Sequence, residues 1–205
     1  MKTKIDFAIL KTGLLDRDFD KLCQEGADFR GLCVYPHRAY RASLMVPNTK
    51  IISVIGFPSG ASQVKFEEAV RVVEYSDELD VVWNLDDFIN GRYLTIVKSL
   101  AAIVNLGLPV KVIVPGLEYL GFEKIQFAYR IVQNSGAFCI KTLTNDPTLN
   151  FFLLECWKEM SGLKIKVAGG IDNYNLAKAL LDVGADFIGT SQGVKIIEEE
   201  KKCQQ

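Results

Sequence analysis

The chain alternates short apolar runs with longer segments in which apolar residues recur every three or four positions. A short, nearly continuous apolar run is typical of a parallel strand buried on both faces, whereas the longer spacing is typical of an amphipathic helix. The apolar runs predict eight strands, at residues 5–10, 31–35, 51–57, 79–84, 110–114, 138–142, 165–168 and 187–190.

The segments between these runs predict helices. In the third of them Phe66, Ala69, Val70 and Val73 form an apolar stripe, which is the pattern of a helix that packs one face on a core. The predicted helices cover residues 16–24, 38–45, 64–76, 93–106, 122–134, 147–160 and 174–183, and residues 194–202 form a last helix.

A weak internal repeat supports the same register. Gly26, Gly136 and Gly184 are each followed by Ala and lie between a predicted helix and a predicted strand. We expect each glycine to end its helix in a left-handed conformation. Repeated strand–helix units require a parallel sheet with right-handed crossovers. Eight such units in this length favour a compact (β/α)8 TIM barrel, and a doubly wound open sheet is the structural alternative.

Composition narrows the class of protein. The 205 residues are 49% hydrophobic and 24% charged, which is ordinary for one globular domain, here residues 1–205. The net charge of -1 gives no electrostatic reason to expect a nucleic acid or a membrane as partner. The chain shows no signal peptide and no apolar run of transmembrane length.

The cysteine and histidine residues exclude several kinds of site. Five cysteines without a C-x-x-C pair suggest neither a disulfide framework nor a zinc site. They fit a reducing compartment, so we expect a cytoplasmic protein. His37 is the only histidine, so the chain cannot form a histidine cluster that binds a metal. We interpret His37 as a turn residue. We therefore expect no metal.

Two lysines interrupt apolar strands. Lys141 and Lys166 lie at the ends of the sixth and seventh predicted strands, where a buried ammonium loses solvation unless something compensates it. In a TIM barrel the C-terminal strand ends surround the active site. Like-charge repulsion and desolvation both lower a lysine pKa, and a neutral amine is what a Schiff-base nucleophile needs.

Asp80 in the fourth predicted strand could offset part of this charge and shuttle protons. The alternative is that each lysine extends from the barrel rim without a chemical role. Lys111 begins the fifth predicted strand, which predicts a place on the opposite rim or in a supporting ion pair.

Two turns rich in glycine follow the last two predicted strands. The first contains Gly169 and Gly170, and the second contains Gly189, Ser191 and Gly193. Loops at these two strand ends commonly bind phosphate in TIM barrels, because backbone N–H groups can approach the anion closely there.

With these residues in view, the chain resembles the deoxyribose-phosphate aldolases, which are class I Schiff-base aldolases with a (β/α)8 barrel. The resemblance runs from about Asp6 to Val194 in seven pieces that keep the order of the family. These are residues 32–36, 54–60, 79–82, 110–113, 138–144, 166–171 and 184–191.

The resemblance implies a role for each matching residue. Lys141 would form the Schiff base, Lys166 would lower the pKa of that amine, and Asp80 would serve the proton relay. The implied reaction is reversible cleavage of 2-deoxy-D-ribose 5-phosphate to D-glyceraldehyde 3-phosphate and acetaldehyde, without a metal or an organic cofactor. Thr144 matches a position beside the substrate, and Gly169, Gly170, Gly189 and Ser191 match the phosphate site.

The chain departs from the family pattern at several positions. Asn145 and Asp146 stand where the family has glycine followed by a basic or apolar residue, and Asp172 stands where it has a basic residue. Ala8 replaces a threonine in the Asp-x-Thr motif of Asp6, and residues 114–116 lack the usual glutamate. Both Asp146 and Asp172 are expected to cap helices.

A carboxylate at a helix N-terminus also occupies the place that would attract a phosphate. Weaker phosphate binding is therefore predicted. The alternatives are a Schiff-base aldolase for another or an unphosphorylated aldehyde or keto-sugar, and a non-catalytic barrel that binds a metabolite. Phe151, Phe152 and Trp157 on one predicted helix indicate either packing on the barrel or the face of a homodimer.

Overall fold

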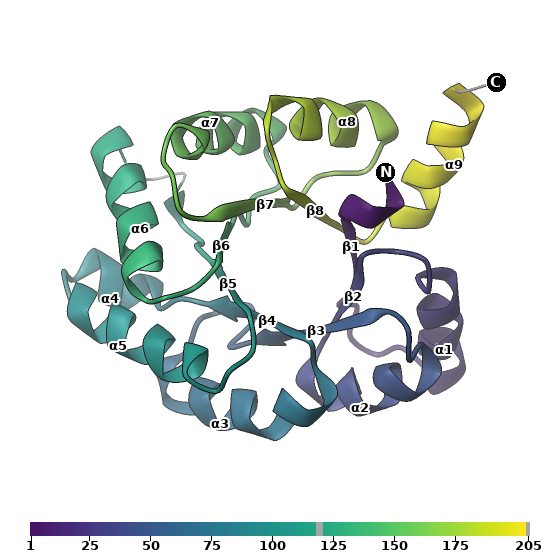
Figure 1. Ribbon diagram of the computed structural model, residues 1–205, viewed down its shortest axis with the longest axis horizontal. Helices are drawn as coiled ribbons and strands as arrows, with labels where there is room; N and C mark the ends of the chain where they lie inside the picture. The colour runs from purple at the N-terminus through teal and green to yellow at the C-terminus, as the bar shows by residue number, and fades with distance from the viewer. Residues whose placement is uncertain (118–120, 204–205) are drawn as a thin grey trace.

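Eight parallel strands close into a barrel in chain order, with β1 paired to β8, and helices surround it (Figure 1). The computed structural model describes residues 1–117 and 121–203, apart from the side chains of residues 62 and 63. The predicted (β/α)8 barrel is confirmed. The strands are β1 (Ile5–Ile9), β2 (Gly31–Val34), β3 (Lys50–Ile55), β4 (Glu78–Val82), β5 (Val110–Ile113), β6 (Cys139–Lys141), β7 (Lys164–Ala168) and β8 (Phe187–Thr190).

The helices follow the predicted order and lie outside the strands (Figure 1). They are α1 (Asp16–Glu25), α2 (Pro36–Met45), α3 (Ser62–Val72), α4 (Leu85–Ile89), α5 (Tyr93–Val104), α6 (Phe122–Asn134), α7 (Pro147–Lys158), α8 (Tyr174–Val183) and α9 (Gly193–Cys203), with short 3-10 turns η1 (Lys2–Lys4) and η2 (Val73–Tyr75). None of the helices within the described ranges is both long enough and apolar enough to cross a membrane.

Two differences from the predicted helices have local causes. The predicted helix over residues 64–76 is in fact α3 followed by the 3-10 turn η2, which tightens the backbone before β4. The short helix α4 was not predicted, since five residues show too little periodicity. Its N-cap is Asn84, whose side chain accepts a hydrogen bond from the Asp87 amide at 3.1 Å.

The outer helices pack on the barrel through large apolar side chains. Trp157 is fully buried, and its indole N–H donates to the Ile125 carbonyl on α6 at 3.3 Å. Tyr129 is also buried; its hydroxyl donates to the Met160 carbonyl and accepts from the Leu163 amide. Trp157 therefore belongs to the packing between α7 and α6, whereas Phe152 stays 43% exposed.

The repeated glycines have two different roles. Gly136 and Gly184 have φ angles of 81° and 130°, so they adopt the left-handed backbone that was predicted. The prediction is wrong for Gly26, whose φ is -90°. A Cβ atom there would lie 2.4 Å from Leu32 and 2.8 Å from Phe7, so this glycine is needed for the close packing of α1 on the strands.

Candidate active site

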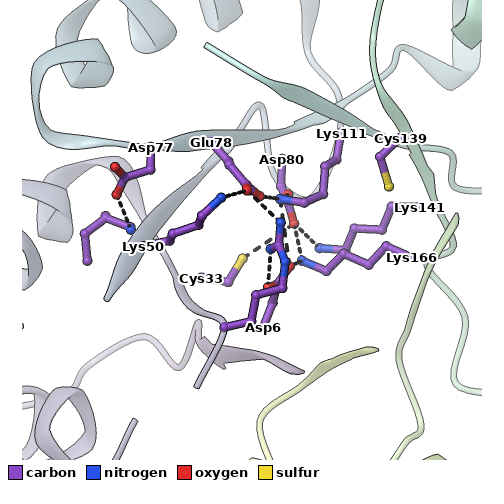
Figure 2. Close-up of polar contacts among 12 residues, drawn as sticks. Asp6, Cys33, Lys50, Asp77, Glu78, Asp80, Lys111, Cys139, Lys141 and Lys166 are labelled. Carbon is purple, nitrogen blue, oxygen red and sulfur yellow. Dashed lines mark hydrogen bonds and ion pairs between the residues drawn. The ribbon is translucent and has the colours of Figure 1, made fainter. Parts of the chain in front are cut away.

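A single buried carboxylate holds three lysines at the centre of the barrel. Asp80 on β4 is fully buried, and its Oδ2 atom accepts hydrogen bonds from Lys141 at 2.7 Å and Lys166 at 2.9 Å. Its Oδ1 atom accepts from Lys111 at 3.0 Å. Figure 2 shows these side chains converging from neighbouring strands. The two lysines predicted to form the site, Lys141 and Lys166, thus donate to the same oxygen atom of the predicted Asp80.

Strand register explains this convergence. Asp80 pairs with Lys111 on the next strand, and Lys141 pairs with Lys166 across β6 and β7. Residues in register on neighbouring parallel strands point to the same face, here the interior. Lys141 ends β6, but Lys166 lies in the middle of β7 rather than at its end. Lys166 is completely buried and Lys141 is 5% exposed, so Lys141 stands nearer the mouth.

Asp6 on β1 is a second buried carboxylate that binds the lysines. In the sequence it stands out only as part of an incomplete Asp-x-Thr motif. Its Oδ2 atom lies 2.6 Å from Lys166, and its Oδ1 atom accepts a hydrogen bond from Arg30 at 2.6 Å. Asp6 is fully buried. A charged residue inside an apolar strand is the same signal that marked the two lysines, and it could have identified Asp6 as well.

Glu78 extends the charged network below Asp80. It contacts Lys111, and its Oε1 atom accepts from Arg30 at 2.6 Å and from Lys50 at 2.8 Å. Of the two predicted places for Lys111, the supporting ion pair is confirmed. The residue lies fully inside the barrel and not on the opposite rim. The side chain of Lys50 is 52% exposed, so the network ends in solvent on that side.

The carboxylates of this network are held in their ionised form. Burial opposes the charge of Asp80, but attraction by Lys111, Lys141 and Lys166 keeps its pKa well below the usual range. Burial likewise opposes the charge of Asp6, and Lys166, Lys111 and Arg30 lower its pKa. Opposite charges within about 4–6 Å outweigh desolvation in such sites.

The two deeper lysines are held in their protonated form for the same reason. Burial alone would lower the pKa of Lys166, but Asp6 and Asp80 raise it above the usual value. Burial also works against a charged Lys111, and Asp80, Asp6 and Glu78 raise its pKa. Both residues are therefore cations and cannot serve as free amines.

Charge balance singles out Lys141. Three carboxylates, on Asp6, Glu78 and Asp80, face three cations, on Arg30, Lys111 and Lys166. These buried carboxylates and cations balance one another, and Lys141 contacts only Asp80 among the three carboxylates. Of the three lysines that share Asp80, Lys141 contacts one carboxylate, Lys166 contacts two and Lys111 contacts three.

A cavity of about 670 Å³ opens above the cluster. Lys141 and Lys166 line its buried end. Asp80 lies beneath the lysines rather than on the wall. The predicted Gly169, Gly170, Gly189 and Ser191 all line the cavity, so the structure brings the four together with the two lysines.

These glycines are required by close packing. A Cβ atom on Gly169 would lie 2.3 Å from the Thr144 carbonyl oxygen, and one on Gly170 would lie 2.6 Å from that of Asn145. A Cβ on Gly189 would lie 2.9 Å from Cε of Lys166. Glycine therefore lets the loops after β6 and β7 touch, and it leaves room for the Lys166 side chain.

Thr144 is placed apart from the other predicted residues. Its hydroxyl accepts a hydrogen bond from the Asp146 amide at 3.2 Å, and it is absent from the described residues that line the cavity. Thr142, two residues earlier, is buried and bonded to Asn150 at 2.7 Å. The role of Thr144 beside the substrate stays a prediction.

The two aspartates behave differently. Asp146 is the N-cap of α7, as predicted, and accepts from the Thr148 amide at 2.9 Å; it does not belong to the described cavity wall. The prediction that Asp172 caps a helix is wrong: Asn173 is the N-cap of α8, and it accepts from the Leu176 amide. Asp172 lines the cavity instead.

Thiol and imidazole groups do not offer an alternative nucleophile. All five cysteines are free. Cys33 lines the cavity, but burial and the charge of Asp80 raise its pKa to about 11, so it is a thiol rather than a reactive thiolate. His37 is exposed and stacks on Tyr35 with ring centroids 5.8 Å apart, at the start of α2.

Comparison with known proteins gives consistent matches. The chain is 35% identical over 205 residues to the deoxyribose-phosphate aldolase of Aquifex aeolicus. The alignment covers 95% of this chain and 94% of the relative. No protein-family model matches the chain.

Solved structures agree with this relationship. An aldolase called QR15 superposes with a TM-score of 0.90 at 33% identity, covering 99% of this chain and 96% of the other. The deoxyribose phosphate aldolase of Aeropyrum pernix, described as tetrameric, superposes with a TM-score of 0.88 at 30% identity, covering 98% and 91%.

Proposed function

This chain belongs to the deoxyribose-phosphate aldolase family, and from that premise we propose that it cleaves 2-deoxy-D-ribose 5-phosphate through a Schiff base on Lys141. The products are D-glyceraldehyde 3-phosphate and acetaldehyde, and the reaction is reversible. The shared carboxylate of Asp80 carries the proposal, because it holds Lys141 beside the buried ammonium of Lys166 at the inner end of the cavity.

The first step is attack by the free amine of Lys141 on the aldehyde carbon of the open-chain sugar. A proton relayed from the Lys166 ammonium to the carbinolamine hydroxyl lets it leave as one water, and a protonated imine remains. A protonated imine withdraws electrons from the neighbouring carbon, which prepares the next bond for cleavage. The iminium places a positive charge on the Lys141 nitrogen, and Asp80 at 2.7 Å supplies a counter-charge.

Cleavage of the C2–C3 bond then needs a base for the C3 hydroxyl proton. The electron pair of the broken bond forms an enamine on the acetaldehyde fragment, and the C3 carbon leaves as the aldehyde of glyceraldehyde 3-phosphate. Protonation of the enamine and hydrolysis by one water release acetaldehyde and restore Lys141. Asp80 and Lys166 are the groups next to the reacting nitrogen that can relay these protons.

The phosphate end of the sugar is assigned to the loops after β7 and β8. Gly169, Gly170, Gly189 and Ser191 line the same cavity as the two lysines. Exposed backbone at glycine can bring N–H groups close to an anion. The placement of these four residues on the cavity wall supports the role that the family resemblance implies for them.

Asp172 favours a second candidate substrate. Its carboxylate lies on the cavity wall near these loops, where it repels a phosphate dianion. The same amine chemistry would then act on unphosphorylated deoxyribose or on another aldehyde or keto-sugar. Asp146 does not support this alternative, since it is occupied as the cap of α7.

Steady-state kinetics with both sugars test the proposed function. The enzyme is expected to cleave deoxyribose 5-phosphate with at least tenfold higher kcat/KM than deoxyribose, as glyceraldehyde 3-phosphate release measures. Lys141→Met should lower activity at least about a thousandfold, because it removes the nucleophile. Lys98→Met on the exposed face of α5 is the matched control and should retain full activity. Equal or better cleavage of deoxyribose would favour the second substrate.

The proposal also covers location and assembly. A cytoplasmic enzyme fits five free cysteines, of which four are buried. The tetrameric relative from Aeropyrum pernix supports an assembly of several copies, with a homodimer as the smallest. Size-exclusion chromatography with light scattering measures the number of subunits.

A further inference from the structure

The exposed wall of the cavity carries two charged side chains within the described residues, and they have opposite signs. Lys11 follows β1, and Asp172 follows β7. The remaining exposed polar side chains on this wall, Asn145, Ser191 and Gln192, are neutral. Lys11 is therefore the cation that a negatively charged ligand meets at the entrance.

Lys11 has no partner among the residues that the structure describes. It makes no hydrogen bond or ion pair with any residue in the described ranges. Another cation, Arg38, borders a smaller cavity of about 220 Å³ that Lys11 also lines. Arg38 is bound to the Asp16 carboxylate and donates to the Leu14 carbonyl at 3.0 Å. Arg38 is thus occupied, whereas Lys11 is free to bind a ligand.

The two ends of the cavity carry the groups that a ligand with an aldehyde at one end and an anion at the other would meet. The aldehyde carbon must reach Lys141 at the buried end. The opposite end of the sugar then points toward the exposed wall, where Lys11 stands. A lysine carries its charge on a flexible four-carbon stem, so its ammonium can follow a phosphate group.

We propose that Lys11 binds the phosphate monoester end of the substrate and determines the preference of the enzyme for a phosphorylated sugar. This inference rests on the proposed function. Lys11 supplies, from the loop after β1, the positive charge that is missing from the loops after β6 and β7, where Asn145 and Asp172 stand. Asp172 weakens the same interaction by repulsion.

Kinetics of Lys11→Met test this role. Because a hydrogen bond between charged groups is lost, kcat/KM for deoxyribose 5-phosphate should fall roughly tenfold to a hundredfold. The loss should appear mainly in KM, and kcat/KM for unphosphorylated deoxyribose should stay within about twofold of the parent value. Lys98→Met should change neither substrate. An unchanged ratio between the two sugars in Lys11→Met would overturn the proposal.

Asp172→Asn provides the opposite change at the same wall. Removing the carboxylate should raise kcat/KM for deoxyribose 5-phosphate several-fold, and it should leave the unphosphorylated sugar unaffected. The double variant Lys11→Met/Asp172→Asn is compared with Lys11→Met. If both side chains act on the same phosphate, this gain in kcat/KM for deoxyribose 5-phosphate should be smaller than the gain of Asp172→Asn over the parent. Gains of equal size would count against a shared binding site.

A binding measurement separates this proposal from the proposed function. Calorimetric titration with inorganic phosphate needs no chemical step, and Lys11→Met should weaken binding about tenfold relative to the parent protein and Lys98→Met. Equal phosphate affinity in all three proteins would refute the role of Lys11 even if the sugar is cleaved. If the parent protein cleaves neither sugar, the proposed function fails, and the phosphate titration alone decides the role of Lys11.

Discussion

Glu78 stands two residues before Asp80 on β4 and points into the same interior. It contacts Lys111, Arg30 and Lys50, so it pairs with three cations, as Asp6 and Asp80 also do. Its pKa falls from 4.5 to about 2; burial opposes the shift, and attraction by Lys111 together with hydrogen bonds from Lys111, Lys50 and Arg30 outweighs it.

The pKa of Glu78 predicts how stability depends on pH. The folded-state pKa lies below the unfolded one, so the ionised form stabilises the fold above pH 4.5, and this contribution disappears as the pH falls through about 2. Glu78→Gln should therefore lower the free energy of unfolding by about 3 kcal/mol at pH 7. The difference from the parent should shrink between pH 4.5 and pH 2, as urea denaturation measures.

Glu25→Gln is the control for this experiment. Glu25 lies on the outer helix α1 and pairs with Lys21 at 3.7 Å in an exposed position. An exposed pair contributes little, so this variant should unfold like the parent at every pH. A stability difference for Glu78→Gln that stays constant down to pH 3 would show that ionisation of Glu78 is not what stabilises the barrel.

Individual side chains differ in how well the sequence predicts them. Lys141, Lys166 and Asp80 could be found because a charge inside an apolar strand is costly and needs a reason. Asp6 gives the same signal inside the first predicted strand, whereas Glu78 precedes the predicted strand 79–84 and follows another acidic residue, so it does not. Lys11 could not be found in this way, since lysines are usually exposed and a lysine in a loop therefore gives no signal.

Two helices of the barrel show where a local prediction succeeds and where it fails. Asp146-Pro147 was expected to start α7, and the structure confirms it. The helix α8 spans residues 174–183 as predicted, but its N-cap is Asn173 and not Asp172, which was expected to cap it. Both residue types are good N-caps, so the sequence alone does not distinguish neighbours in Asp172-Asn173.

Alanine substitutions distinguish the two residues. Asn173→Ala should lower the free energy of unfolding by about 1 kcal/mol, because the Leu176 amide loses its acceptor. Asp172→Ala should change it by less than about 0.5 kcal/mol. Thermal and urea denaturation of the two variants measure the difference. A larger loss for Asp172→Ala than for Asn173→Ala would contradict the assignment of the cap.

The order of strands and helices was predictable because the spacing of apolar residues repeats over many positions in each segment, so no single residue decides it. Strands β1 to β8 and the eight long helices all appear where the pattern placed them. What the pattern could not supply is the short α4 and the 3-10 turn η2, which contain too few residues to establish a period.

The closed barrel explains why distant residues meet. Lys166 and Asp80 are 86 residues apart in the chain and lie 2.9 Å apart in the structure. Closure of β8 on β1 also brings Asp6 to Lys166. No local pattern contains these contacts; they follow from the strand order and register, which is why the sequence predicted a pair of lysines but not the complete network of charges.

The role of Lys141 as the amine that forms the Schiff base is the centre of the proposed function. Its most direct test is brief exposure to dilute acetaldehyde with borohydride, followed by peptide mapping by mass spectrometry. We predict an ethyl group on Lys141 in the parent protein and in Lys98→Met, and none at this site in a folded Lys141→Met variant. An ethyl group on another lysine while Lys141 stays unmodified, or no modification at all, would contradict the account.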